Sequence, residues 1–469
     1  MSPADWRSWS ALFAALMLLS CSAAADDCDT LQDPESVIAA CTQSINSGKW
    51  SGRNLAINYT NRGSGYRAKG DLDHAIADFT EAIRLDPEHV MAFNNRGVAY
   101  TNKGDLDRAI ADYNAAIRIN PKFAMAIGNR GSAYSDKGDL DRAIADYSEA
   151  IRLDPKAAIA LYNRGIAYRA KGDIDRAIAD YSEAVRLNPN YVIAFNNRGL
   201  AYNYKGDGDR AIADYSQAIR LAPRFANGFS NRGAAYRSKG DLDRAIADYN
   251  EAIRLDPKDA FAFNNRGNAY NDKGDPDRAI ADYTEAVRLD PQYARAFHNR
   301  GVAYNAKGDN DRAIADFNEA IRLDPRDARA IYNRGFAYSA KGDKDRAFAD
   351  FDEAVRIDPR DATAFYNRGI ADKDKGDLDH AIADYSEAIR LDPNYVMALN
   401  NRGVVYSAKG DNDRAIADYT EAIRLVPKFA TAFRNRAVAY TAKGDADRAS
   451  ADTNEAIRLD PKSGLGQSR

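Results

Sequence analysis

The chain is poor in the residues that build metal sites and nucleophilic triads. Among its 469 residues there are three cysteines and four histidines. No histidine stands at ligand spacing from a cysteine or from a second histidine, so the sequence supports neither a zinc site nor a histidine-based triad. The four histidines are His74, His89, His298 and His380.

An excess of charge of one sign is also missing. The 66 lysines and arginines nearly balance the 69 aspartates and glutamates, and the formal net charge is -3. A nucleic-acid-binding protein needs a basic patch or stripe. Because no such footprint is present, we expect no nucleic-acid partner.

Loops that hold phosphates or calcium are missing as well. There is no phosphate-binding glycine loop, and Asp71-Leu72-Asp73 lacks the glycine and the distal glutamate that a calcium loop requires. Helix capping explains that aspartate better. We therefore expect no catalytic residues, no metal and no cofactor, and we predict that the protein is not an enzyme.

What the chain does have is a period of 34 residues. The motif Asn-Arg-Gly recurs at this interval eleven times, and a variant, Asn435-Arg436-Ala437, closes the series. A period of this length is typical of a repeat array built from one supersecondary unit. The motif begins at Asn61, Asn95, Asn129, Asn163, Asn197, Asn231, Asn265, Asn299, Asn333, Asn367 and Asn401.

Each unit repeats the same order of bulky, small and proline residues. The unit from Val90 to Phe123 has Phe93, Asn95-Arg96-Gly97, Ala99-Tyr100, Lys103-Gly104-Asp105, Arg108 to Tyr113 and Pro121. In length and order this unit resembles the tetratricopeptide repeat family. The resemblance implies an all-α, right-handed α-solenoid superhelix of about twelve helix-turn-helix repeats over residues 56–463. It also implies binding of partner proteins or peptides on the concave face.

The residues within one unit predict where its two helices pack and end. Phe93, Gly97 and Tyr100 share a face of the first helix, and Ala109 and Tyr113 share a face of the second. Gly104 is suited to end the first helix in the left-handed conformation, and Asp105 to cap the second. Pro276 predicts the start of the second helix in its own unit, since proline is tolerated at the first helical position.

An arginine and an aspartate recur at facing places of the two helices. Arg96 stands where the family more often has leucine, and Asp112 faces it from the second helix. We expect an ion pair in every unit, from Arg62 with Asp78 to Arg436 with Asp452. The alternative is a ladder of arginines that binds an anionic ligand. The recurring asparagine also has two interpretations, a framework role or a hold on the main chain of a bound peptide.

The first 25 residues differ from the rest of the chain. Arg7 precedes an apolar run from Trp9 to Leu19, which is too short to span a bilayer and is typical of a secretory signal. Cleavage after Ala25 is one processing route. Lipidation of Cys21, in a segment that resembles a lipoprotein box, is the other and is the only membrane attachment we expect. Both predict an exported protein, periplasmic or outer-membrane-associated.

Removal or acylation of Cys21 leaves Cys28 and Cys41 as a pair. In an oxidising compartment such a pair suggests a disulfide. The alternative is a free Cys28 and a small buried Cys41. Residues 26–55 are predicted to form an N-terminal cap that contains one lone helix near Ser36 to Ile45. Residues 464–469 are expected to be a C-terminal tail.

One face of the first helices varies from unit to unit while the packing residues hardly change. We call it the first-helix stripe, the places of Met91, Asn94, Val98, Thr101 and Asn102, and we predict that it is exposed. Early units carry apolar residues there, and units eight to ten carry arginines and aromatics, which are the usual anchors of interfaces. We predict that the arginines and aromatics of units eight to ten form a patch that binds the partner. The alternative is that these exposed residues vary by neutral drift. The patch consists of Arg295, His298, Arg329, Tyr332, Phe336 and Tyr366.

One unit breaks its own pattern, because Asp372 stands where every other unit has a packing tyrosine. An unpaired buried carboxylate is costly. We therefore expect that the helix opens locally or that Lys373 or Lys375 pairs with Asp372, and that unit ten is a soft joint.

The features together predict a non-catalytic interaction scaffold or adaptor of the cell envelope. The alternative is a structural envelope protein that associates with itself.

Overall fold

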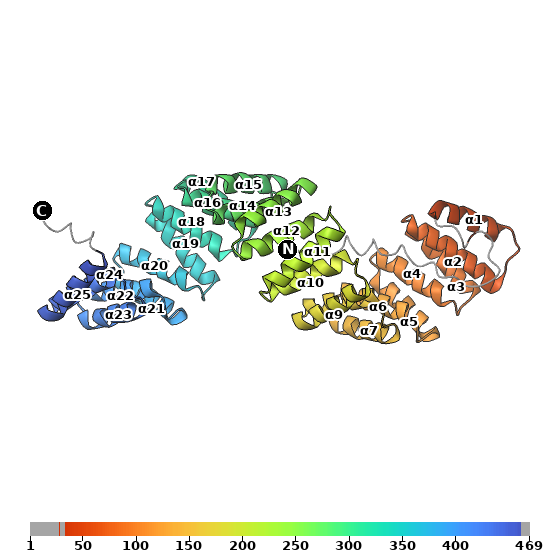
Figure 1. Ribbon diagram of the computed structural model, residues 1–469, viewed down its shortest axis with the longest axis horizontal. Helices are drawn as coiled ribbons and strands as arrows, with labels where there is room; N and C mark the ends of the chain where they lie inside the picture. Colours follow the sequence, from red (N-terminus) through yellow and green to blue (C-terminus); the bar gives the residue numbers. More distant parts are fainter. Residues whose placement is uncertain (1–27, 29–32, 461–469) are drawn as a thin grey trace. The chain divides into compact units, whose positions relative to one another are not determined.

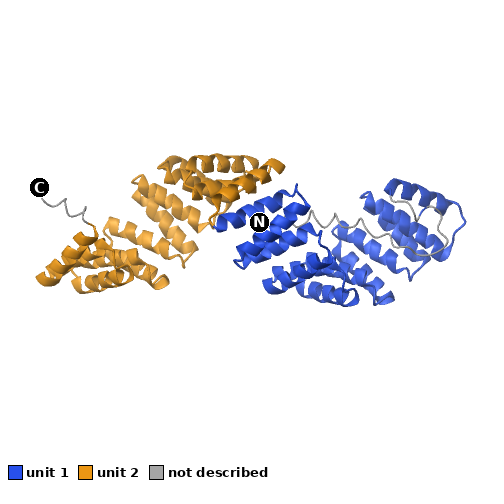
Figure 2. Cartoon of the chain, in the orientation of Figure 1, with its two compact units in different colours: residues 1–239 blue, residues 240–469 orange. Residues whose placement is uncertain are grey.

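The computed structural model of the protein describes residue 28 and residues 33–460. The predicted signal peptide (1–25), Cys21 and the predicted tail (464–469) lie outside the described residues. The chain divides into two compact units, unit 1 (residues 1–239) and unit 2 (residues 240–469), and each 34-residue unit of the sequence is called a repeat from here on (Figure 2). Each unit is described by itself.

Within the described part of the chain every regular element is a helix, and after the first helix the elements alternate as predicted (Figure 1). The first helices of the twelve repeats are α2 (Gly52–Ala68), α4 (Val90–Asn102), α6 (Ala124–Asp136), α8 (Ala158–Ala170), α10 (Val192–Tyr204), α12 (Ala226–Ser238), α14 (Ala260–Asp272), α16 (Ala294–Ala306), α18 (Ala328–Ala340), α20 (Ala362–Lys375), α22 (Val396–Ala408) and α24 (Ala430–Ala442).

The second helices have almost constant length because their start and stop signals recur. They are α3 (Leu72–Leu85), α5 (Leu106–Ile119), α7 (Leu140–Leu153), α9 (Ile174–Leu187), α11 (Gly208–Leu221), α13 (Leu242–Leu255), α15 (Pro276–Leu289), α17 (Asn310–Leu323), α19 (Lys344–Ile357), α21 (Leu378–Leu391), α23 (Asn412–Leu425) and α25 (Ala446–Leu459). Repeat 1 is α2 with α3, and repeat 12 is α24 with α25.

The predicted helix signals are confirmed. Gly104 has a φ of 79° after α4, a value that a residue with a Cβ adopts only at a cost. The Asp105 carboxylate then accepts a hydrogen bond from the backbone N–H of Arg108 and so caps α5. Pro276 is the first residue of α15. The all-α repeat fold therefore follows from residues that recur in the sequence.

Small residues let the two helices of a repeat approach closely. Ala99, Ala109 and Ala116 are fully buried, and Tyr113 is 1% exposed. A Cβ on Gly97 would lie 2.7 Å from Cε1 of Tyr113. Within each unit, a helix packs on the helices before and after it, and first helices of successive repeats also touch, as α4 does with α6.

The expected arginine–aspartate pair is present in every repeat that lies within one unit. Arg96 donates from Nε and Nη2 to the two oxygens of Asp112, both at 2.8 Å. Its Nη1 also donates to Thr80 Oγ1 of the preceding second helix, at 3.0 Å. Because the guanidinium also bonds the helix before its own repeat, as Arg62 does with Thr42 of the helix that precedes repeat 1, the structural interpretation of these arginines is favoured over an anion-binding ladder.

Helix α1 (Pro34–Asn46) precedes the repeats and packs on α2. It corresponds to the predicted lone helix. The Gly65 backbone of α2 lies against Val37 and Ile38 of α1. Cys41, buried within α1, forms a disulfide with Cys28, with Cα atoms 5.1 Å apart. The disulfide ties α1 to the chain segment that precedes it.

Candidate functional site

The first-helix stripe is only partly exposed. Met91 and Asn102 are exposed, and Val98 and Thr101 are half-buried. Asn94, however, is 1% exposed, so the prediction that its place belongs to an exposed face is wrong. The helix in the next repeat covers it.

A ladder of hydrogen bonds between repeats explains why the place of Asn94 is covered. In most repeats the asparagine of the Asn-Arg-Gly motif reaches back to the side chain at the place of Asn94 in the preceding first helix. Asn129 Nδ2 donates to Asn94 Oδ1 at 3.0 Å, and Asn435 makes the equivalent bond to Asn400 at 3.0 Å. These contacts confirm the framework role of the recurring asparagine.

Three members of the predicted patch take part in the same ladder. Asn367 Nδ2 donates to the Tyr332 hydroxyl at 3.0 Å, and Asn401 Nδ2 donates to the Tyr366 hydroxyl at 3.1 Å. The Nδ2 atom of Asn333 lies 3.4 Å from Nε2 of His298. All three patch side chains stand at the place of Asn94, so they connect repeats as well as lining the stripe.

Aromatic contacts bury these three side chains further. The ring of His298 lies 5.9 Å from that of Phe317, and the ring of Tyr332 lies 5.8 Å from that of Phe351. The ring of Tyr366 lies 4.9 Å from that of Tyr395 in the next repeat. Burial raises the pKa of Tyr332 to about 12. A partner can therefore reach only part of each of these side chains.

The freely accessible part of the patch consists of Arg295, Arg329 and Phe336. Phe336 is 48% exposed, and the Arg329 side chain is 78% exposed. Arg329 has only a distant carboxylate, with Nε 3.9 Å from Asp327 Oδ1. The Arg295 side chain makes no hydrogen bond or ion pair with any residue that the structure describes. Both differ in this respect from the framework arginines.

The same place carries apolar side chains in unit 1. Met91, Met125 and Ile159 stand where Arg295 and Arg329 stand in unit 2, and they are 39%, 43% and 50% exposed. Tyr204, at the end of α10, is 79% exposed. In unit 2, Phe261 and Met397 also stand at this place and are 39% and 45% exposed, so the arginines distinguish repeats 8 and 9 and not the whole unit.

Asp372 lies in the regular helix α20 and is 6% exposed. The expectation that the helix opens is wrong, because α20 runs unbroken to Lys375 and ends at Gly376 with a φ of 85°. The expected lysine partners are also wrong. Lys373 pairs with Asp374 at 3.5 Å, and Lys375 pairs with Asp345 at 3.7 Å and lies 3.8 Å from the ring centre of Phe348.

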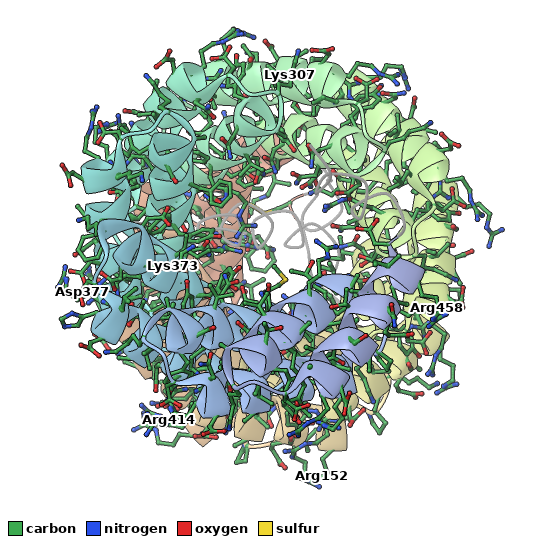
Figure 3. All side chains as sticks on the ribbon, turned by 90° about the vertical axis from the view of Figure 1, so that its left-hand side faces the viewer. Arg152, Lys307, Lys373, Asp377, Arg414 and Arg458 are labelled. Atoms are coloured by element: carbon green, nitrogen blue, oxygen red, sulfur yellow. A yellow bond between two sulfur atoms is a disulfide. The ribbon has the colours of Figure 1, made fainter. Side chains whose placement is uncertain are left out.

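Charged pairs at the edge of the repeats were missed by the sequence reasoning. From repeat 2 on, the lysine of the Lys-Gly-Asp motif reaches the preceding repeat, as Lys103 does with Asp73 at 2.5 Å. The guanidinium of Arg108 lies 4.6 Å from the ring centre of Tyr100. The constant spacing of these residue types was the available signal. In Figure 3, Asp377 and Arg414 project from this outer edge of the helices in unit 2.

Within residues 33–460 and residue 28, no group of three or more histidines, cysteines, aspartates or glutamates is placed to hold a metal ion. No helix in the described part of the chain combines the length and the apolar character needed to cross a membrane.

Several solved structures are similar to the chain. MamA is 30% identical over 35% of this chain and 96% of its own, with a TM-score of 0.34. YrrB, a TPR protein with an unusual peptide-binding site, is 24% identical over 39% of this chain and 95% of its own, with a TM-score of 0.35. Yeast Tom70 is 17% identical over 88% of this chain and 99% of its own, with a TM-score of 0.40. No curated protein matches the chain significantly.

Family matches extend over most of the repeats. The tetratricopeptide repeat family matches residues 60–122, 129–192, 192–225 and 328–361. The TPR repeat family matches residues 233–274, 267–308, 301–342, 371–410 and 406–444. These matches coincide with the helix pairs described above, and the chain therefore belongs to the tetratricopeptide repeat family.

Proposed function

We propose that this protein is a non-catalytic scaffold that binds a protein or peptide partner through the first-helix stripe of repeats 8 and 9. Repeat arrays of this kind use the extended surface of stacked units for binding. The single observation that carries the site is the pair of arginines without close carboxylates, Arg295 and Arg329, beside the exposed Phe336. Arginine and aromatic side chains dominate the energetics of interfaces.

The contrast with the framework supports this site. Framework arginines such as Arg300 and Arg334 each donate two hydrogen bonds to one aspartate. Arg295 and Arg329 are the same residue type on the same helices, and among the described residues neither side chain has an aspartate that accepts two hydrogen bonds from it. An unneutralised guanidinium costs nothing in water and gains a charge-assisted hydrogen bond when an acceptor arrives.

Affinity capture from an extract of the source cells tests the proposal. The bait is compared with a variant that carries Arg295→Glu, Arg329→Glu and Phe336→Ala. The matched control carries Arg326→Glu and Arg360→Glu, because these arginines are also exposed but lie in the loops before the first helices. We expect a partner that binds the wild type and the control but not the stripe variant. Equal capture by all three baits would remove this site.

A second candidate is self-association through the C-terminal repeat. There Val438 is 64% exposed and Ile457 is 47% exposed. Light scattering over a concentration series separates the two functions. A scaffold without its partner keeps a constant mass, whereas a self-associating array grows with concentration.

The proposed location is the cell envelope, reached by export and either cleavage after Ala25 or lipidation of Cys21. The intact mass of the mature protein distinguishes these routes. An N-terminus at Asp26 supports a soluble periplasmic protein, and an acylated Cys21 supports attachment to the outer membrane. A mass that retains residues 1–25 unmodified would exclude both.

A further inference from the structure

In repeat 10, both members of a side-chain pair that packs together in other repeats are different residues. In repeat 9 the guanidinium of Arg346 lies 4.5 Å from the ring centre of Tyr338, and repeat 8 has the same contact between Arg312 and Tyr304. The equivalent residues in repeat 10 are His380 and Asp372. Histidine alone is compatible with the usual packing, because in repeat 1 His74 stacks on Tyr66 with ring centres 5.1 Å apart. The aspartate is therefore the exceptional change.

The surroundings of Asp372 offer it little compensation. The charged groups that act electrostatically on its carboxyl are Arg368 from its own helix, Asp377 at the N-cap of α21, and His380 and Asp384 within α21. The titratable Tyr385 of α21 also interacts with it. Val405 of α22 packs into the apolar cluster around α21, so α22 contributes an uncharged side chain there. Acidic groups therefore outnumber the cations on the side of α21.

The one nearby arginine is already shared by two other carboxylates. Arg368 donates to Asp384 at 2.7 and 2.8 Å and to Asp352 at 2.7 Å. Among the described residues no cation lies within ion-pair distance of the Asp372 carboxylate. Burial and the nearby Asp384 and Asp377 raise the pKa of Asp372 to about 6.

We propose that repeat 10 is a pH-responsive joint, in which the packing of α20 on α21 tightens when the Asp372 carboxyl takes up a proton and loosens when it ionises. The neutral acid stays buried beside α21 without the cost of an isolated charge. Acid also favours protonated His380, because its hydrogen bond with Asp377 raises the pKa of His380.

The sign of the effect follows from proton linkage. The pKa of Asp372 is higher in the folded repeat than in the unfolded chain, so the folded repeat binds the proton more tightly. Its stabilisation is complete at low pH and is lost as the pH rises through about 6. Between about pH 7 and about pH 5 the opening equilibrium of repeat 10 should change by about tenfold.

The joint lies next to the proposed binding site. Asn367 of α20 donates to Tyr332 of α18, and Tyr366 of α20 accepts from Asn401 of α22. Loosening of α20 would therefore weaken the support of the stripe in repeat 9. This consequence for binding rests on the proposed function, whereas the pH response of repeat 10 itself does not.

Hydrogen–deuterium exchange of the full chain without any partner tests the joint. Protection of α20 and α21, corrected for the intrinsic exchange rate, should be about tenfold higher at about pH 5 than at about pH 7. Repeat 11, which has Tyr406 and Arg414 at the same places, serves as the internal control and should show no such gain.

Two variants keep the test decisive. Asp372→Asn removes the titrating group and should abolish the pH response of α20 and α21. Asp372→Tyr with His380→Arg restores the pattern of the other repeats, and should give high protection at both pH values. A pH response that persists in Asp372→Asn, or wild-type protection that is flat or falls with acid, would overturn the proposal. Neither result bears on whether repeats 8 and 9 bind a partner.

Discussion

Units 1 and 2 carry the same framework, and their first-helix stripes differ in repeats 8 and 9, where unit 2 has arginines. In unit 1, Arg96 holds Asp112 with two hydrogen bonds, and in unit 2 Arg402 holds Asp418 in the same way. On the first-helix stripe, Met125 of unit 1 corresponds to Arg329 of unit 2. The difference shows that helix packing fixes the interior of every repeat and leaves the exposed place free to take on recognition chemistry.

The largest expected effect comes from breaking the shared framework. Asp112→Ala or Asp418→Ala leaves a half-buried guanidinium without its carboxylate, and each should reduce the free energy of unfolding by about 3 kcal/mol. Urea denaturation, followed by exchange in each repeat, measures this loss. The matched control, Arg402→Met with Asp418→Leu, removes both charges and should be much milder. A large loss in one unit and none in the other would contradict a shared framework.

Overpacking the helix contact should have the next largest effect. A Cβ on Gly97 would lie 2.7 Å from Tyr113 Cε1, and one on Gly403 would lie 2.6 Å from Tyr419 Cε1. Either glycine-to-alanine change should destabilise its repeat by about 1–2 kcal/mol. Repeat 12 carries Ala437 naturally, and Thr453 replaces the tyrosine there.

Thermal unfolding, combined with hydrogen–deuterium exchange resolved for each repeat, measures the destabilisation that the added Cβ causes. Ala437→Gly is the control and should bring no stabilisation, because the smaller Thr453 already leaves room for a Cβ. Gly403→Ala that is as stable as the wild type would show that the tyrosine moves aside freely.

A pH change should affect the two units in opposite directions. Burial lowers the pKa of His89, whose Nε2 lies 3.2 Å from Thr60 Oγ1 between repeats 1 and 2. A lowered folded pKa gives stability at neutral pH that is lost as the pH falls, so acid should loosen α2 and α4. Exchange rates at these helices measure the effect, and His89→Gln should remove the pH dependence. Tighter α2 and α4 in acid would contradict this sign.

Exchanging the exposed residues should alter stability least. Arg295→Met with Arg329→Met gives unit 2 the side chains of unit 1, and the free energy of unfolding should change by at most about 0.5 kcal/mol. Capture of the partner should nevertheless fall strongly. Met91→Arg with Met125→Arg is the reciprocal control and should leave capture unchanged. Lost stability in the first variant would mean that these arginines belong to the framework.

Most of the fold could be predicted because its signals are local and recur. Gly104, Asp105 and Pro276 each determine a helix boundary through their own backbone chemistry. The Arg96–Asp112 pair was predictable because both residues recur together within the same unit.

The site was less predictable, because a helical wheel describes one helix and not its neighbour. Asn94 is covered since Asn129 of the next repeat reaches back to it, and His298, Tyr332 and Tyr366 share that place. Asp372 was expected to attract the lysines beside it in sequence. Those lysines reach Asp374, Asp345 and Phe348 instead, and only the structure shows where they point.

Hydrogen–deuterium exchange of the full chain with and without the captured partner tests the recognition surface most directly. We expect new protection in α16 and α18, around Arg295, Arg329 and Phe336, and unchanged exchange in α4 and α6. Protection confined to α4 and α6, or none in any first helix, would contradict the claim that the arginine-bearing stripe of unit 2 is the recognition surface.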